Sequence, residues 1–136
     1  MNSLFTAIFS HFSATTDSGL YSDLSGRMYL NFAPQGVTFP YCVYSSVVDI
    51  DELDFSDERE DFTIQFDIFT ENNSAIEAGQ LLESLKTMFD DCSLNVTGWR
   101  HLEFSRVGVT PNNDFSTEPA IQGYSVEYDV LLEKER

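Results

Sequence analysis

The chain has 136 residues, a length that suits a single domain (1–136) with one hydrophobic core and no need of disulfide bonds. Hydrophobic residues make up 42% of the sequence and aromatic residues 14%, which excludes a disordered chain. With 23 acidic and 7 basic side chains, the formal net charge is −16. Such a charge argues against holding nucleic-acid phosphates on a broad basic face and against docking on an anionic membrane.

The first part of the sequence predicts one helix followed by two strands. Apolar side chains recur at helical spacing from Asn2 to about Ala14, which predicts a helix with one apolar face. Residues 15–26 are rich in Ser, Thr, Asp and Gly and predict a loop. A short strand is expected at 27–32, a turn at 33–36, and a second strand at 41–48. The apolar face of the helix consists of Leu4, Phe5, Ile8, Phe9 and Phe12.

An acidic segment follows at 49–61, where eight of thirteen positions are Asp or Glu and Arg59 is the one base. Like charges at this density repel one another, so the segment is expected to be a flexible loop. Residues 62–69 then alternate strictly between apolar and polar side chains. This pattern predicts a half-buried antiparallel strand.

The second half of the sequence predicts a helix and two strands. Ser74 and Glu77 have the spacing of a capping box, which predicts a helix that ends near Phe89. Strands are expected at 99–107 and 121–132, joined by a polar loop. The order of elements predicts an α+β fold, with an antiparallel or mixed β-sheet of about four to five strands and two main helices packed on one face.

We find no sequence pattern that predicts catalysis. Neither the register that starts at Asp49 nor the one that starts at Asp54 places oxygen ligands and glycine as an EF-hand requires, and no pair of Cys or His has zinc-site spacing. Nucleophile elbows and glycine-rich phosphate loops are also missing from the sequence. His11 and His101 are expected to be surface or hydrogen-bonded histidines, His101 on the polar face of its strand. We therefore expect a protein that is not an enzyme and has no catalytic residue, cofactor or metal site.

The N-terminal residues lack the basic region of a signal peptide, and no apolar run reaches the roughly 18 residues that span a bilayer. The sequence therefore predicts synthesis in the cytoplasm and no membrane contact. In that compartment Cys42 and Cys92 are expected to be buried thiols rather than a disulfide.

Three segments carry a resemblance to a known family: Arg27-Met28-Tyr29, Ala33-Pro34-Gln35-Gly36, and the run from Phe39 to Ser45. Together with the order of elements, they resemble the small bacteriophage tail-completion proteins of the tail-terminator family over essentially the whole chain. The resemblance implies a structural virion protein, made in the host bacterial cytoplasm and located at the head-proximal end of the tail. It would form a ring, probably a hexamer, that caps the tail tube and ends its polymerisation.

The implied partners are other copies of the chain, the tail tube protein and a head-completion or connector protein, while DNA passes through the lumen without specific binding. A closed ring needs heterologous contacts, in which one patch meets a different patch. Part of the negative charge is expected to line the lumen, where it would keep DNA from sticking. Simple solubility is the other explanation of this charge.

The residues expected at a subunit or tail-tube interface are of two kinds. The acids of the 49–61 segment are candidates for docking, and the rare arginines are candidates for pairing with carboxylates of a neighbour or of their own chain. The acidic candidates are Asp49, Asp51, Glu52, Asp54, Asp57, Glu58, Glu60 and Asp61, and the basic candidates are Arg27, Arg100 and Arg106. Alternative functions are another head–tail connector or head-closure protein, a small acidic cation-binding module, and a DNA mimic.

Overall fold

The computed structural model describes residues 2–14, 17, 19–52, 59–72 and 75–134, which form three helices and five strands. The helices are α1 (Asn2–Ser13), α2 (Gly19–Leu24) and α3 (Ile76–Phe89). The strands are β1 (Met28–Leu30), β2 (Tyr41–Glu52), β3 (Arg59–Glu71), β4 (Trp99–Pro111) and β5 (Ile121–Lys134).

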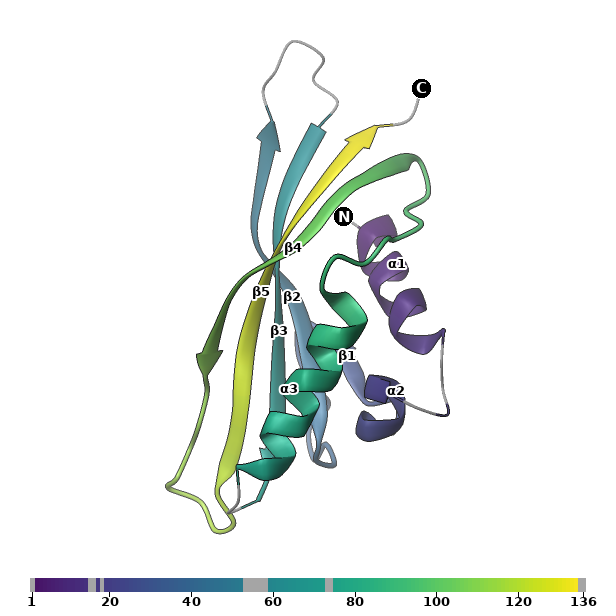
Figure 1. Cartoon of the computed structure of the whole chain (residues 1–136). Helices are drawn as coiled ribbons and strands as arrows, with labels where there is room; N and C mark the ends of the chain where they lie inside the picture. The colour runs from purple at the N-terminus through teal and green to yellow at the C-terminus, as the bar shows by residue number, and fades with distance from the viewer. Residues whose placement is uncertain (1, 15–16, 18, 53–58, 73–74, 135–136) are drawn as a thin grey trace.

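The five strands form one mixed sheet in the order β1-β2-β3-β5-β4. The short β1 pairs in parallel with β2, and the other neighbours are antiparallel. All three helices lie on one side of this strongly twisted sheet (Figure 1). The predicted α+β fold with a mixed sheet and helices on one face is therefore confirmed, and β1 and β4 form the two edges of the sheet.

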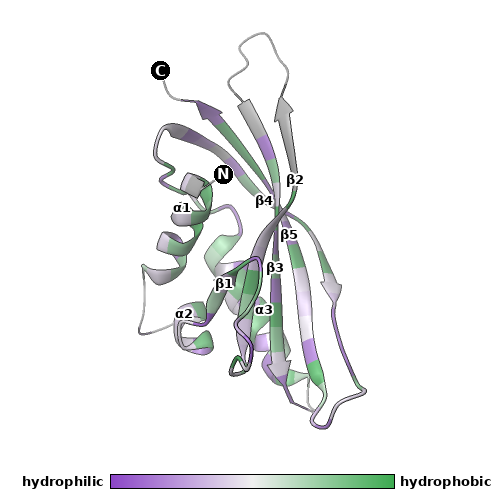
Figure 2. Cartoon of the chain, turned by 180° about the vertical axis from the view of Figure 1, so that it is seen from behind, coloured by the Kyte–Doolittle hydropathy of each residue, from purple (hydrophilic) through white to green (hydrophobic). Residues whose placement is uncertain are grey.

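The core lies between the sheet and the helices. Apolar and polar residues alternate along the strands, as the colouring of Figure 2 shows. The predicted alternation on β3 is confirmed, because Phe62, Ile64, Phe66 and Ile68 are at most 1% exposed while the residues between them are half-buried on the other face. The strand residues of the core include Phe62, Ile64, Phe66, Ile68, Val126, Tyr128, Val130 and Leu132, and the helical ones include Leu4, Ile8, Phe12, Leu81, Leu85 and Phe89.

An aromatic cluster joins the C-terminal end of α3 to the centre of the sheet. The ring of Phe89 lies 4.6 Å from that of Phe66 and 5.8 Å from that of Phe104, measured between centroids. The ring of Tyr128 lies 4.9 Å from Phe104. Offset and edge-on aromatic pairs of this kind add about 0.5–1.5 kcal/mol each beyond the burial of their surface.

Two predicted loops are wrong in part. Residues 19–24 of the expected loop at 15–26 form α2, whose Leu20 and Leu24 are completely buried. The expected flexible loop at 49–61 is wrong at both ends, because 49–52 belong to β2 and 59–61 to β3. Backbone pairing with the central strands outweighs the repulsion among these acids, since β3 is hydrogen-bonded on both sides.

Two local details of the second half also differ from expectation. The N-cap of α3 is Ala75, which makes no side-chain capping hydrogen bond, and Ser74 of the predicted capping box lies outside the described residues. In β4, a register shift between His101 and Glu103 turns His101 onto the face of Phe104 rather than the polar face. A single inserted residue in an antiparallel pair produces this change of face.

Candidate functional site

The acidic segment forms the far end of the β2–β3 hairpin. Its backbone pairs Ile50 with Asp61 and Asp51 with Glu60, so two acidic residues stand directly opposite each other. Like charges at opposite positions of a ladder are destabilising. Of the predicted interface acids, Asp49, Asp51, Glu52, Glu60 and Asp61 are placed on these strands, whereas Asp54, Asp57 and Glu58 lie outside the described residues.

The three predicted interface arginines lie at opposite edges of the sheet. Arg100 pairs with Glu133 across β4 and β5, and Arg106 Nη1 lies 3.0 Å from Asp90 Oδ2. Arg27, just before β1, instead donates from Nε to Pro40 O at 2.9 Å and from Nη2 to Phe39 O at 3.3 Å. Arg100 and Arg106 thus have intramolecular carboxylate partners, and a role for any of the three at an interface stays a prediction.

The face of the sheet opposite the helices is polar over the middle of β3 and β5, while Tyr41 and Phe69 form an aromatic pair at one end of it. Asp67 accepts hydrogen bonds at Oδ1 from Ser125 Oγ at 2.5 Å and from Gln65 Nε2 at 2.9 Å. Thr63 Oγ1 donates to Asp129 Oδ1 at 3.4 Å further along the same two strands. These bonds fix the side chains across β3 and β5. They leave a surface of hydroxyl, amide and carboxylate groups across β3 and β5.

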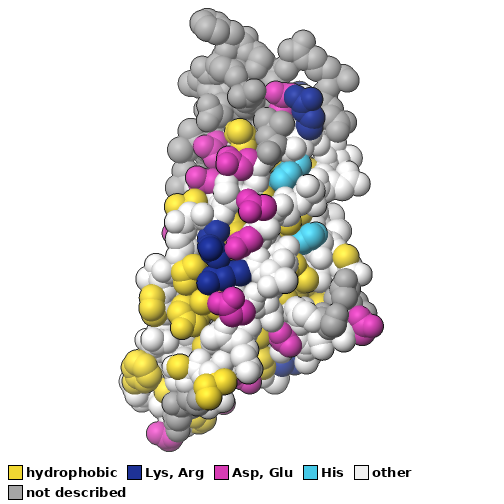
Figure 3. Space-filling view, in the orientation of Figure 1, with side chains coloured by type: hydrophobic (Ala, Val, Ile, Leu, Met, Phe, Trp, Pro, Cys, Tyr) yellow, Lys and Arg dark blue, Asp and Glu magenta, His cyan; other side chains and the backbone are white. Residues whose placement is uncertain are grey.

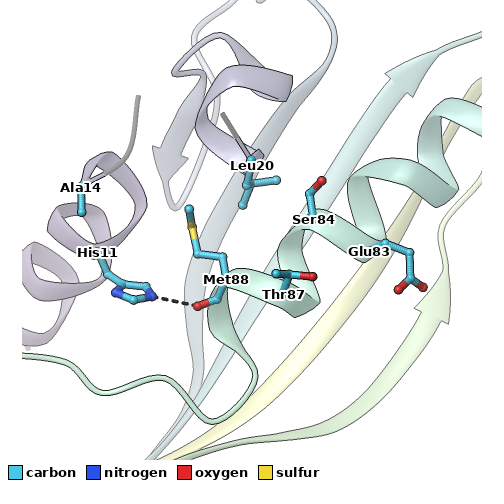
Figure 4. A pocket seen from close by; sticks show the side chains of 8 residues that line it. His11, Ala14, Leu20, Glu83, Ser84, Thr87 and Met88 are labelled. Carbon is cyan, nitrogen blue, oxygen red and sulfur yellow. Dashed lines mark hydrogen bonds between the residues drawn. The ribbon is translucent and has the colours of Figure 1, made fainter. Parts of the chain in front are cut away.

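A pocket of about 520 Å³ lies between the three helices (Figure 4). His11 lines this pocket, and its protonated Nε2 donates to Met88 O at 2.8 Å, near the C-terminal end of α3. The other lining residues are Ala14, Gly19, Leu20, Glu83, Ser84 and Thr87. This hydrogen bond connects α1 to α3. The wall of the pocket is mostly apolar and does not bring reactive groups together.

A second groove, of about 480 Å³, lies at the β1 edge of the sheet between α1 and the strands. Its wall is held together by Tyr44, whose hydroxyl donates to Phe5 O at 3.4 Å and whose ring lies 6.1 Å from that of Phe5. The residues that line it are Phe5, Thr6, Phe9, Ser10, Leu30 and Tyr44. Phe9 is 39% exposed here, although its position in the helix suggested a core residue.

The opposite edge of the sheet also exposes apolar side chains. Val107 is 58% exposed on β4, and Phe115, in the β4–β5 connection, is 70% exposed. Figure 3 shows hydrophobic side chains gathered over this end of β4, next to a mixed cluster of basic and acidic groups. Sequence reasoning missed both apolar surfaces. The one signal available was the presence of aromatic residues, Phe32 and Phe115, inside polar connections.

The groups that could act as nucleophiles or metal ligands are poorly placed for either role. Burial raises the pKa of the Cys42 thiol, and burial likewise raises the pKa of Cys92 to about 12. Both are free cysteines, as expected, but only Cys42 is buried, while Cys92 is half-buried. Burial lowers the pKa of His101, whose Nε2 has no hydrogen-bond partner. Within the described ranges, no cluster of three His, Cys, Asp or Glu residues could bind a metal ion.

No protein-family model matches this chain, and none of the curated proteins matches it either. Among the solved structures, the fold is similar to that of a chain in the virion of a native gene transfer agent particle. The two share a TM-score of 0.60 and 10% sequence identity, over 90% of this chain and 97% of the other. At this identity the likeness establishes a shared fold. Of the helices that the structure describes, none has the length and apolar character to cross a membrane.

Proposed function

We propose that this chain is a structural virion protein that caps a phage-type tail tube as a ring, ends its polymerisation and forms the surface that joins the tail to the head. The observation that carries the proposal is the structural similarity to a chain of a gene transfer agent virion, which covers nearly the full length of both chains. The resemblance of the 27–45 segments to tail terminators supports the same conclusion.

The geometry supports an assembly role over a catalytic one. The two pockets at the helices are open grooves lined mainly by apolar or unreactive groups, and the Cys42 thiol is buried. The two edges of the sheet carry different surfaces. A ring of identical subunits requires this, because one patch of each subunit binds a different patch of its neighbour.

The acidic hairpin end is the proposed contact with the tail tube protein. The backbone register places Asp51 opposite Glu60, and like charges at opposite positions of a ladder cause repulsion. A partner that supplies basic groups would relieve this repulsion, so docking there gains free energy that an isolated surface charge does not give. Acids left facing the lumen would keep passing DNA from sticking, because like charges repel over roughly the 8–10 Å Debye length.

The test is a tube-capping assay. Growing tail tubes of the cognate phage are incubated with the protein, and tube lengths and ends are measured by electron microscopy. We expect growth to stop and a ring to stand at one end of each tube. A quintuple amide variant (Asp49→Asn, Asp51→Asn, Glu52→Gln, Glu60→Gln, Asp61→Asn) is expected to lose capping, while the control Glu103→Gln, on β4, keeps it.

Unchanged tube lengths and bare tube ends with the wild-type chain would contradict the proposal. Binding to the portal side of the head, without affinity for the tube, would instead favour the alternative of a head-closure or connector protein. Stoichiometric cation binding, or inhibition of a DNA-binding enzyme, would favour a cation-binding module or a DNA mimic.

A further inference from the structure

Two apolar surfaces lie on opposite edges of the same sheet, and neither has an occupant within the described chain. The groove flank comprises the 480 Å³ groove and the neighbouring Phe32, which is 77% exposed. The hairpin flank comprises Val107, Val109 and Phe115, on β4 and in the β4–β5 connection. One surface is concave and the other is formed by protruding side chains.

The dimensions of the groove fit an aromatic side chain. A closed cavity of about 150 Å³ is large enough to hold benzene. The groove, at about 480 Å³, therefore accepts a phenylalanine ring together with a neighbouring side chain. Leu30, 37% exposed, and Phe9 provide an apolar wall for such a ring.

The hairpin flank is built to make contacts through side chains rather than through its backbone. Asn112 N donates to Gly123 O across the ladder, so the preceding residue, Pro111, has its nitrogen on the outer side of the edge strand. Proline offers no N–H there, and a register shift between Arg106 and Gly108 bends the strand. Both features disfavour the addition of another strand, while they leave Val107 exposed at the bend.

The distribution of charge favours contact between these two flanks. Residues 24–48 include β1 and the strand residues that line the groove. They contain no Asp or Glu, and their one basic residue is Arg27. Residues 1–16, which include α1, contain no acid either. The β4–β5 connection, by contrast, carries Asp114 and Glu118. In a chain of net charge −16, two copies can approach without acid–acid repulsion only where one of them presents a surface free of carboxylates.

We propose that the hairpin flank of one copy docks on the groove flank of the next, with Phe115 seated in the groove. This is the contact between neighbouring subunits of the ring. The contact itself is argued from the two flanks, and only the closure of the ring rests on the proposed function. The contact is heterologous, since the two flanks differ, and it lies at opposite edges of one sheet. Repeating it adds copies in one rotational sense, and the rotation closes a ring if the proposed function holds.

The test uses two one-sided variants and no tail tubes. Leu30→Glu places a carboxylate in the groove, and Phe115→Glu replaces the inserted ring. Gln80→Glu, on the exposed side of α3, is the matched control for one added charge. Mass is measured by sedimentation velocity from 10 μM to 1 mM in 0.3 M salt, which screens the net repulsion of the chains.

We expect the wild-type chain and the control to form oligomers and each one-sided variant to lose association by at least tenfold. An equimolar mixture of the two variants is expected to form a 1:1 dimer and nothing larger, because it holds one intact groove flank and one intact hairpin flank. That dimer also proves that both variants are folded.

Three results would overturn this contact: a wild-type chain that stays monomeric at 1 mM, one-sided variants that associate like the control, or a mixture that does not dimerise. These results are separable from the tube-capping assay. Capping with unaffected variants would refute the contact and leave the function standing. If the mixture dimerises but the wild-type chain does not cap tubes, the contact would be supported and the proposed function refuted.

Discussion

The hydroxyl of Tyr128, at the centre of β5, donates a hydrogen bond of 2.6 Å to Asp90 Oδ1, immediately after the end of α3. The other carboxylate oxygen of Asp90 lies 3.0 Å from Arg106 on β4. One carboxylate therefore connects the end of the helix to two strands. Asp91, next in sequence, has a φ of +54° and donates its N–H to Phe104 O, which turns the chain away from the helix at this point.

Removing the hydroxyl of Tyr128 is expected to destabilise the fold. Hydrogen bonds to charged groups contribute about 1.5–3 kcal/mol, and the low end applies here because Asp90 keeps Arg106 as a partner. We expect Tyr128→Phe to lower the free energy of unfolding by about 1.5 kcal/mol in urea titrations. The control is Tyr124→Phe on the same strand, for which a change within about 0.5 kcal/mol is expected. Equal losses in both variants would contradict the assigned bond.

Stability is expected to fall at alkaline pH. Burial, and then the bond to Asp90, raise the pKa of Tyr128, and burial raises the pKa of Cys92 from its usual 9.0 to about 12. Because each group loses its proton more easily in the unfolded chain, this stability is present below about pH 9 and is lost as the pH rises towards 12.

The measurement is the midpoint of urea unfolding at intervals from pH 7 to pH 11. Cys92→Ser is expected to make the decline above pH 9 shallower, with the contributions of Cys42 and Tyr128 remaining, and to leave the profile from pH 7 to pH 8 parallel to that of the wild type. The same decline in both proteins would show that Cys92 titrates alike in the folded and unfolded chains.

Two glycines are expected to respond to alanine in opposite ways. A Cβ at Gly123 on β5 would overlap the backbone carbonyl oxygen of Ile68 on the neighbouring strand, which cannot move without breaking the ladder. Gly79, inside α3, has an ordinary helical backbone and open space where a Cβ would lie. We expect Gly123→Ala to abolish soluble expression or to lower the melting temperature by more than about 10 °C. Gly79→Ala should stabilise the chain by about 0.5–1 kcal/mol.

Truncation of a core aromatic should be far more costly than truncation of an exposed one. Phe66 is completely buried, and its ring lies near those of Phe89 and Tyr128. Phe66→Ala is expected to cost about 3–5 kcal/mol, which would leave little of the stability of a domain of this size. Phe32→Ala, at a 77% exposed position, should change it by less than about 0.5 kcal/mol when measured at low micromolar concentration. Comparable costs would mean that Phe32 is packed in solution.

The parts of the fold that could be predicted are those with a long, regular pattern. The alternation at 62–69 and the helical spacing before Phe89 identified β3 and α3 correctly. The helix α2 was missed because its six residues contain only two apolar anchors, Leu20 and Leu24, among loop-forming residues. The face of His101 was wrong because a one-residue bulge leaves no trace in the alternation of side chains.

The candidate surfaces could not be predicted in the same way. The groove is lined by residues from position 5 to position 44 on two strands and a helix, and only the folded chain brings them together. The acidic segment was singled out from the sequence. That its ends belong to β2 and β3 could not be predicted, because β3 is held by β5, which is far away in the sequence and pairs Leu132 with Glu60.

The outer edge of β4 has a further consequence for any assembly of this chain. A strand that lacks an outward N–H at Pro111 and has a register shift at Val107 is a poor template for the stacking of identical strands. Under the proposed contact, two copies bind through complementary side-chain surfaces, and the folded domain sets the angle between them. That angle would then decide how many copies close a ring.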